Sequence, residues 1–319
     1  MFATGEGTAR YRDRFPAFRD AGFYRTVFGL EVSTLGIGTY LGSEDDATDR
    51  AYTEALIAAG EGGINFFDTA INYRRQRSER CIGAALKQLQ RDEIVVCTKA
   101  GFLTPGATPE KLNREDVVGG MHCMAPDFLA DQIERSRANL GVDTIDVFYL
   151  HNPETQLGFV SHAEFDTRIR RAFAQLELLA DQGKIRWYGA ATWEGLRKKG
   201  ALNLARLAEI AAEEGGAEHR FRFIQLPFNL NMVEAFVERP ESVLEAAARL
   251  GIAAVASATL LQGQVLAHRD AVQAIQFTRS TPGISTALVG MSRREHVVEN
   301  LGVASVLPMT REEYVRHYQ

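Results

Sequence analysis

Short apolar runs alternate with longer amphipathic stretches along the chain from residue 35 onwards. The short runs are rich in β-branched residues, and apolar positions in the longer stretches recur every three or four residues, so the pattern predicts strands that alternate with helices. The predicted strands span residues 35–40, 64–69, 94–99, 144–150, 185–190, 223–227, 252–257 and 286–289. The predicted helices span residues 47–59, 78–89, 126–140, 163–182, 202–214, 242–250, 271–278 and 293–304.

The alternation of eight strands with eight helices predicts an α/β protein whose parallel strands are covered by helices. We favour a closed (β/α)8 TIM barrel over an open doubly wound sheet, because no break in composition divides the chain and 319 residues fit one barrel. Gly141, Gly183 and Gly251 follow three of the predicted helices, where a left-handed residue often ends a helix.

The chain is predicted to form a single domain with a short addition at its N-terminus. Residues 23–27 and 31–34 flank a turn that contains Gly29, which predicts a short β-hairpin before the barrel. We therefore predict a barrel domain over residues 23–319 and a polar N-terminal extension over residues 1–22.

Composition narrows the class of protein. The hydrophobic fraction of 45% and the charged fraction of 24% are typical of a soluble globular protein, and a formal net charge of −5 argues against nucleic acid or an anionic membrane as a partner. No run approaches the roughly 18 apolar residues of a membrane-spanning helix, and residues 1–20 lack the apolar segment of a secretory signal. With three sparse cysteines, Cys81, Cys97 and Cys123, which we expect to be free, this predicts a cytoplasmic location. The sequence gives no prediction of the oligomeric state.

Three successive predicted strands end on Asp68, Lys99 and His151, and Tyr73 follows five residues after Asp68. Taken singly, these residues are ordinary: an aspartate caps a helix, a lysine is solvated, a histidine or tyrosine packs. Together they stand at adjacent strand ends after apolar runs, where an unpaired buried charge would be costly. Because barrel enzymes place their chemistry at the carboxyl ends of strands, we expect the four side chains to form a site.

Such a site is suited to moving a proton onto an oxygen. A tyrosine with a pKa near ~10 needs a neighbouring cation if it is to give up its proton near neutral pH, and Lys99 can supply that charge. Asp68 would hold and balance Lys99, while His151 could donate a hydrogen bond to a substrate oxygen and orient a carbonyl.

Two segments resemble the signature of the aldo-keto reductase family. Residues 68–73 read Asp-Thr-Ala-Ile-Asn-Tyr and residues 78–86 read Ser-Glu-Arg-Cys-Ile-Gly-Ala-Ala-Leu, similar to the family's aspartate and tyrosine followed by Ser-Glu and Gly-x-Ala-Leu. The similarity continues through residues 97–99, 145–153 and 183–186, and covers nearly all of the chain after about Tyr24.

The resemblance implies that Asp68, Tyr73, Lys99 and His151 form the family's catalytic tetrad, with Tyr73 as the general acid during hydride transfer from a nicotinamide. The family has no Rossmann domain and binds the dinucleotide extended across the barrel mouth. Consistently, residues 36–42 give only a near miss to the G-x-G-x-x-G fingerprint.

The resemblance also implies a cofactor site. Gly38, Thr39 and Tyr40 would face the cofactor, and Gln225 would hold the nicotinamide amide. The segment after the last strand would bind the adenosine end, where Arg293 and Arg294 favour NADP(H) over NAD(H) by bonding a 2′-phosphate. The other candidate cofactor residues are Thr192, Ser257, Gly290, Ser292, His296, Glu299 and Asn300.

This chain departs from the family pattern at several cofactor positions. Ala191 and Thr192 stand where relatives usually have Ser-Asn, and Ala256 stands where relatives often have an aromatic residue that stacks on the nicotinamide. Phe228 or Trp193 could supply that ring instead. Some relatives also have a phosphate-binding Lys and Arg where this chain has Gly290 and His296.

The long segment over residues 101–126 follows the third predicted strand, and long loops at this end of a barrel commonly shape substrate pockets. We predict that Phe102, His122, Met124 and Trp193 line such a pocket. His122 and Cys123 lack a second pair at metal-ligand spacing, so we predict no metal site.

The leading hypothesis is therefore an NADP-dependent oxidoreductase that interconverts a small-molecule carbonyl and its alcohol. A second hypothesis keeps the tetrad but uses a retained nicotinamide for a redox-neutral isomerisation, epimerisation or elimination, and it is motivated by the departures at Ala191 and Ala256. A third makes the barrel a nucleotide-binding regulatory subunit. Turnover of the cofactor separates the first hypothesis from the other two.

Overall fold

The computed structural model describes residues 1–198, 201–267 and 270–316, and it contains a closed barrel of parallel strands. Within the described residues the strands follow the order β10-β11-β12-β3-β4-β5-β8-β9, and the barrel closes where β12 pairs with β3, with Leu35 beside Ala287. The predicted TIM barrel is confirmed. The barrel strands are β3 (Leu35–Gly38), β4 (Phe66–Asp68), β5 (Val95–Ala100), β8 (Ile145–His151), β9 (Ile185–Ala191), β10 (Phe221–Pro227), β11 (Ala253–Ser257) and β12 (Ile284–Gly290).

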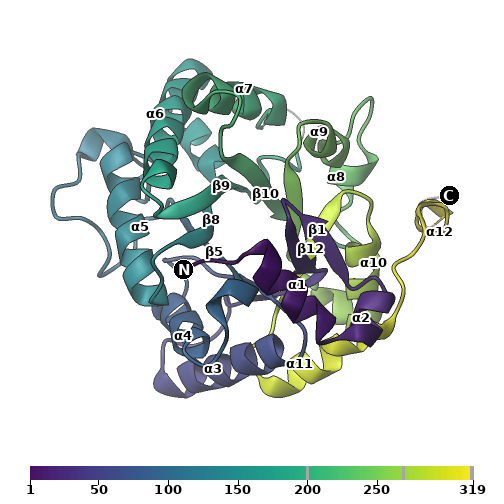
Figure 1. Ribbon diagram of the computed structural model, residues 1–319. Coiled ribbons are helices and arrows are strands. Elements are labelled where there is room, and N and C mark those ends of the chain that lie inside the picture. The colour runs from purple at the N-terminus through teal and green to yellow at the C-terminus, as the bar shows by residue number, and fades with distance from the viewer. Residues whose placement is uncertain (199–200, 268–269, 317–319) are drawn as a thin grey trace.

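Helices surround this barrel (Figure 1), and each lies close to one of the predicted helical stretches. The surrounding helices are α3 (Asp46–Glu61), α4 (Arg77–Leu86), α5 (Pro126–Leu140), α6 (His162–Asp181), α7 (Leu204–Gly215), α9 (Val243–Arg249), α10 (Ala271–Ser280) and α11 (Arg294–Asn300). Gly141, Gly183 and Gly251 all have φ between 65° and 71°, as predicted for the residues that follow α5, α6 and α9.

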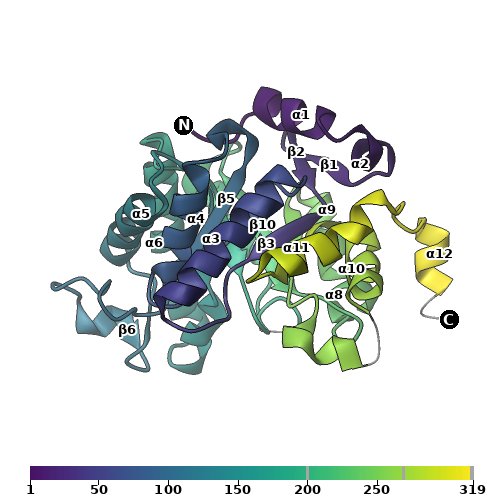
Figure 2. The same ribbon diagram turned by 90° about the horizontal axis from the view of Figure 1, so that it is seen from below.

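Alternate residues of each strand enter two different cores, because successive side chains of a strand point to opposite faces. Phe66 packs inside the barrel, whereas Phe67 packs outward against the helices. The hairpin formed by β1 (Tyr24–Val27) and β2 (Leu30–Ser33) adds Leu30 and Val32 to the inner core. Figure 2 shows this hairpin across one end of the barrel, opposite the end that carries β6 (Val117–Val118).

The polar residues 1–22, predicted only as an extension, fold into α1 (Gly5–Asp13) and α2 (Pro16–Asp20). The Thr4 side chain caps α1, and Pro16 occupies the first turn of α2, where its missing N–H costs nothing. The fully buried Tyr11 donates from its hydroxyl to the carbonyl of Gly60, so this segment is tied to α3.

The long segment after β5 contains a second small hairpin that the sequence analysis did not predict. It pairs β6 with β7 (His122–Cys123), and Phe102 forms a bridge with His122. Two further short α-helices are α8 (Glu234–Val237) and α12 (Arg311–Val315). The three cysteines are free and buried.

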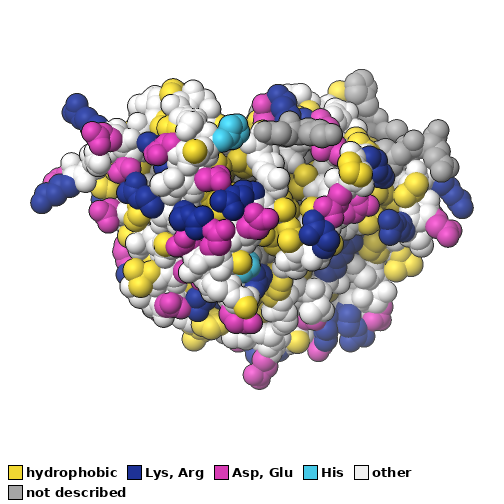
Figure 3. Space-filling model, turned by 90° about the horizontal axis from the view of Figure 1, so that it is seen from above, with side chains coloured by type: hydrophobic (Ala, Val, Ile, Leu, Met, Phe, Trp, Pro, Cys, Tyr) yellow, Lys and Arg dark blue, Asp and Glu magenta, His cyan; other side chains and the backbone are white. Residues whose placement is uncertain are grey.

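The outer surface carries charges of both signs. Figure 3 shows basic and acidic side chains interspersed on the face that includes α6 and α7. Arg170 of α6, for example, pairs with Glu214 of α7 at 2.8 Å. Among the residues described, the helices are all too short or too polar to cross a lipid bilayer.

Candidate active site

A cavity of about 680 Å³ lies among the loops that follow the barrel strands. Its lining comes from the carboxyl ends of the eight barrel strands and from loops that follow them. Its volume lies within the range of small-molecule and cofactor sites, and the cavity occupies the end of the barrel where TIM-barrel enzymes carry out their chemistry.

A buried ion pair lies at the wall of this cavity, and its carboxylate member, Asp68, is part of the lining. Lys99 Nζ donates to Asp68 Oδ1 at 2.6 Å and to the carbonyl of Thr69 at 2.7 Å. Gln225 Nε2 donates to the other carboxylate oxygen, Asp68 Oδ2, at 2.8 Å. Burial, the largest single influence, lowers the pKa of Lys99, but the charge of Asp68, the neighbouring Tyr73 and the hydrogen bond to Asp68 together outweigh it, so the pKa is raised and Lys99 stays cationic.

Tyr73 also lines the cavity and lies beside this ion pair. Its ring is 5.1 Å from Lys99 Nζ and lies against the rings of Tyr40, at 4.9 Å, and His151, at 5.7 Å. Burial raises the pKa of the Tyr73 hydroxyl, and the charge of Lys99 opposes that rise. The phenol is therefore protonated at neutral pH, with a cation beside it to stabilise the phenolate that proton donation would leave.

His151 ends β8, lies against the Tyr73 ring and lines the cavity. Burial, together with the charge of Lys99, lowers its pKa far below the ordinary value, so the imidazole is neutral. Its Nδ1 atom is buried and has no hydrogen-bond partner among the described residues, and the same holds for Asn72 Oδ1 nearby. Phe102 contacts the His151 ring edge-on at 5.2 Å.

The chain leaves Tyr73 through a left-handed turn built without glycine. Arg74, Arg75 and Gln76 have φ values of 47°, 50° and 71°, and each costs roughly 1–2 kcal/mol in that conformation. Such a turn persists only where its surroundings hold it. The buried Arg74 guanidinium pairs with Asp49 of α3 and donates to the carbonyl of Ser43, which anchors the turn directly after Tyr73.

Replacing Arg74 by alanine should lower the free energy of unfolding by about 2–3 kcal/mol, because buried charge-assisted hydrogen bonds are lost. Arg75→Ala is the matched control. It removes the same side chain from the same backbone conformation, but its ion pair with Glu44 is exposed, so stability should hardly change. Urea unfolding of both variants measures the difference, and equal losses would show that the guanidinium contacts of Arg74 are not what holds the turn.

Most of the predicted cofactor residues line the cavity. They are Gly38, Thr39, Tyr40, Thr192, Gln225, Ser257, Gly290, His296, Glu299 and Asn300. Ser292, Arg293 and Arg294 are not part of the lining. Arg293 nevertheless lies directly beside it, 3.0 Å from the Nε2 atom of His296, and both arginines are exposed.

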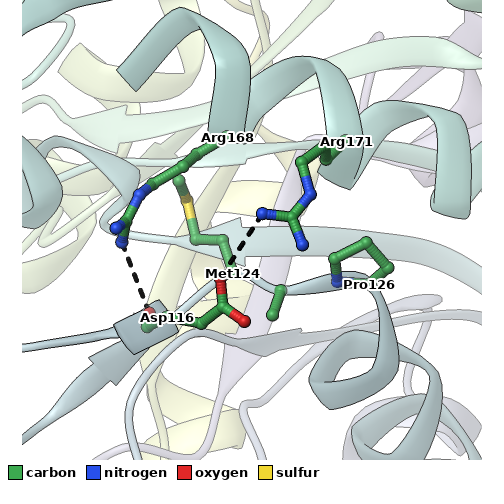
Figure 4. Close-up of a pocket in the computed structure, with 6 residues that line it drawn as sticks. Asp116, Met124, Pro126, Arg168 and Arg171 are labelled. Carbon is green, nitrogen blue, oxygen red and sulfur yellow. Dashed lines mark hydrogen bonds and ion pairs between the residues drawn. The ribbon is translucent and has the colours of Figure 1, made fainter. Parts of the chain in front are cut away.

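The predicted substrate residues divide into two groups. Phe102 and Trp193 line the cavity. His122 is fully buried behind it, where the hairpin of β6 and β7 turns back toward β8. Met124 lies in a separate small depression beside Asp116, Arg168 and Arg171 (Figure 4). Phe228, suggested as a stacking ring, is buried against Phe277, so of the two rings proposed only Trp193 reaches the cavity.

Several lining residues were not singled out in the sequence. Asn72 lies within the signature segment beside Tyr73, and Asn152 follows His151, so both had a detectable signal in their position after a strand. Leu260, Gln262 and Leu266 come from the loop after β11, which carries no motif. Among the described residues, no group of histidine, cysteine or carboxylate side chains is arranged to hold a metal ion.

The fit of a nicotinamide dinucleotide is supported by this chain's own geometry. The lining includes residues from the ends of all eight barrel strands or the loops after them, together with His296, Glu299 and Asn300 of α11, so the cavity spans the barrel mouth that an extended dinucleotide would cross. Within the described ranges, His151 Nδ1 and Asn72 Oδ1 have no hydrogen-bond partner, so the site keeps hydrogen-bonding capacity for a ligand.

Comparisons with known proteins point to one family. A sequence profile of the aldo/keto reductase family matches residues 34–274. The chain is 30% identical over 169 residues to an NADH-specific methylglyoxal reductase of Escherichia coli (strain K12), covering 51% of this chain and 49% of that protein. It is 31% identical over 185 residues to a D-threo-aldose 1-dehydrogenase of a Pseudomonas species, covering 54% and 52%. The chain thus spans about half the length of these curated relatives.

A solved structure shares the fold. The crystal structure of an aldo/keto reductase from Klebsiella pneumoniae, in complex with NADP and acetate, superposes with a TM-score of 0.65 at 19% sequence identity. The match covers 91% of each chain. At this level of identity the likeness shows a common barrel architecture.

Proposed function

The chain belongs to the aldo/keto reductase family, and from that premise we propose that it is a nicotinamide-dependent oxidoreductase that reduces an aldehyde or ketone to an alcohol. The observation that carries this proposal is the buried Asp68–Lys99 pair beside Tyr73, with a neutral His151 against the same phenol ring. This arrangement is suited to protonating an oxygen that gains negative charge.

The proton would come from Tyr73. When bound, the nicotinamide supplies the hydride that adds to the carbonyl carbon. Tyr73 donates its hydroxyl proton to the carbonyl oxygen, and Lys99 stabilises the phenolate that remains. Asp68 keeps Lys99 in place and makes the ion pair nearly neutral overall, which limits the cost of burying it.

His151 would orient the substrate. Because its imidazole is neutral, only one ring nitrogen carries a proton. The buried Nδ1 has no partner in the part of the chain that the structure describes, so we assign the proton to Nε2 and infer that Nε2–H donates to the carbonyl oxygen. A donor fixed in this way aligns the oxygen with Tyr73 before any proton moves.

The experiment that tests the proposed function is titration of NADPH and NADH into the purified protein by fluorescence, followed by a panel of aldehydes and ketones. Consumption of nucleotide in step with alcohol formation would support reduction. Product formation without net loss of nucleotide would instead favour a redox-neutral reaction. If neither nucleotide binds, the proposal fails.

We further propose that NADP(H) is preferred. Arg293 and Arg294 are exposed beside the α11 end of the cavity and have no carboxylate partner within the described part of the chain, so both can bond a 2′-phosphate. The E. coli relative is named NADH-specific, so the preference needs a direct test.

The double variant Arg293→Ala/Arg294→Ala should raise the Kd for NADPH about 10–100-fold, since a charge-assisted hydrogen bond contributes about 1.5–3 kcal/mol. NADH, which lacks the phosphate, is the internal control, and its Kd should stay within about twofold. Equal effects on both nucleotides, or no effect on either, would show that these arginines do not select the phosphate.

A further inference from the structure

A line of hydrogen bonds runs from α6 to the backbone of His151. Arg168 Nη1 donates to Gln156 Oε1 at 2.8 Å, and Gln156 Nε2 lies 2.9 Å from His122 Nδ1. His122 Nε2 lies 2.8 Å from the carbonyl oxygen of His151. His122 and Gln156 are fully buried, and neither residue lines the cavity.

The hydrogen-bond donors in this line determine which ring nitrogen of His122 carries the proton. An arginine can only donate, so it must face the carbonyl end of the Gln156 amide, which leaves the amide N–H groups directed at His122. His122 Nδ1 is therefore the acceptor, and Nε2–H is the donor to His151. Burial lowers the pKa of His122 to about 4, so this neutral form is kept at physiological pH.

The backbone is shaped to allow this contact. A Cβ atom on Gly101 would lie 2.5 Å from the His151 carbonyl oxygen and 2.7 Å from His122 Nε2, so any larger residue would separate the two. Phe102 then places its ring edge-on against both imidazoles, at 5.1 Å from His122 and 5.2 Å from His151.

The carbonyl of His151, which accepts this hydrogen bond, lies where β8 ends and the chain turns into the following loop. It belongs to the last residue of β8 and to the peptide that leads into Asn152, whose φ is 50°. The N–H of Asn152 donates to Ala191 of β9 at 2.7 Å. The peptide that follows His151 is thus held on one side by β9 and on the other by the His122 ring.

We propose that His122 is a positioning residue for the active site: its Nε2–H, oriented through Gln156 by Arg168, fixes the strand end from which His151 reaches the cavity. The effect on catalysis rests on the proposed function, since it acts through the contact of His151 with a carbonyl. The outer end of the line is secured on α6, where Arg168 also donates to Glu164 at 2.8 Å and to the carbonyl of Glu115. Figure 4 shows Arg168 beside Asp116.

Two substitutions separate the hydrogen bond from the ring. His122→Phe keeps an aromatic ring against Phe102 but removes the donor, and it should lower kcat about 10–100-fold with little change in KM, the size of effect that a small misplacement causes. His122→Gln places an amide N–H close to the position of Nε2 and should restore kcat to within about threefold of wild type. A His122→Phe variant with the kcat of wild type would overturn the proposal, and so would equal losses in both variants.

A second readout needs no turnover. In protein labelled with ¹⁵N-histidine, the His122 signals, assigned by comparison with the variants, should show a protonated Nε2 and an unprotonated Nδ1 from pH 8 down to about 5. The His151 signals should shift in His122→Phe and remain close to wild type in His122→Gln. Titration of His122 near its ordinary pKa, or His151 signals unmoved in His122→Phe, would contradict the network. If the wild type reduces no carbonyl compound, the proposed function fails while these spectra still decide whether His122 holds His151.

Discussion

Tyr73→Phe should lower kcat for carbonyl reduction about 10²–10⁴-fold, the contribution typical of a positioned general acid. The substitution removes only the hydroxyl, so the ring contacts with Tyr40 and His151 remain and the cavity keeps its shape. Binding of NADPH should therefore be nearly unchanged, and single-turnover oxidation of bound NADPH should report the loss.

Tyr24→Phe is the matched control, because Tyr24 lies in the hairpin at the other end of the barrel, where its hydroxyl donates to the carbonyl of Gly63. It should keep full activity. The pH profile adds an independent check: a general acid must be protonated, and the pKa of Tyr73 is raised, so reduction should be flat across neutral pH and decline only in alkaline solution. Retention of kcat in Tyr73→Phe would remove Tyr73 from the mechanism.

Lys99→Met should both abolish reduction and lower the free energy of unfolding by about 3–5 kcal/mol, the usual cost of leaving one member of a buried ion pair alone. Asp68 would lose its bond to Nζ and keep only that from Gln225. Denaturant unfolding and steady-state kinetics measure the two effects separately.

The double variant Asp68→Asn/Lys99→Met shows whether the stability lost in Lys99→Met comes from the unpaired charge of Asp68 or from the lost packing of the lysine side chain. It removes both charges, while the amide oxygen introduced at position 68 can still accept from Gln225, so most of the lost stability should return while activity stays absent. If stability does not return, the loss in Lys99→Met comes from the missing side-chain packing and not from the unpaired carboxylate.

The barrel and the placing of its strand ends could be predicted from the sequence because both depend on local patterns. Asp68, Lys99 and His151 follow apolar runs, and every strand ends at the same rim, so their proximity follows from periodicity. Whether Tyr73 reaches these three side chains depends on the conformation of the loop after β4. The position of Tyr73 was therefore predicted from the resemblance to the aldo-keto reductase signature and not from the spacing of residues.

Some residues lie elsewhere than predicted because their positions depend on contacts with segments distant in the sequence. His122 and Met124 were predicted to line the substrate pocket because their loop is long. The loop instead folds back as the hairpin of β6 and β7, and the bridge between Phe102 and His122 that directs it has no local signal. Residues 1–22 were predicted only as polar, because Tyr11 is the kind of isolated apolar position that needs a partner elsewhere in the chain to be recognised.

The left-handed turn after Tyr73 was also invisible, for a different reason. Sequence rules associate positive φ with glycine or asparagine, and Arg74, Arg75 and Gln76 contain neither. The buried ion pair that Arg74 makes joins the turn to Asp49 in α3, and such a contact between separate segments has no local sequence signal.

The pairing of β12 with β3 has a consequence for how the chain folds. Leu35 meets Ala287, so the ring of strands cannot close until nearly the whole chain has left the ribosome. Until then β3 presents an open strand edge, which is prone to pairing with other chains. Synthesis therefore exposes a vulnerable intermediate, and a fragment that stops at residue 274, where the family profile ends, would lack the strand that closes the barrel.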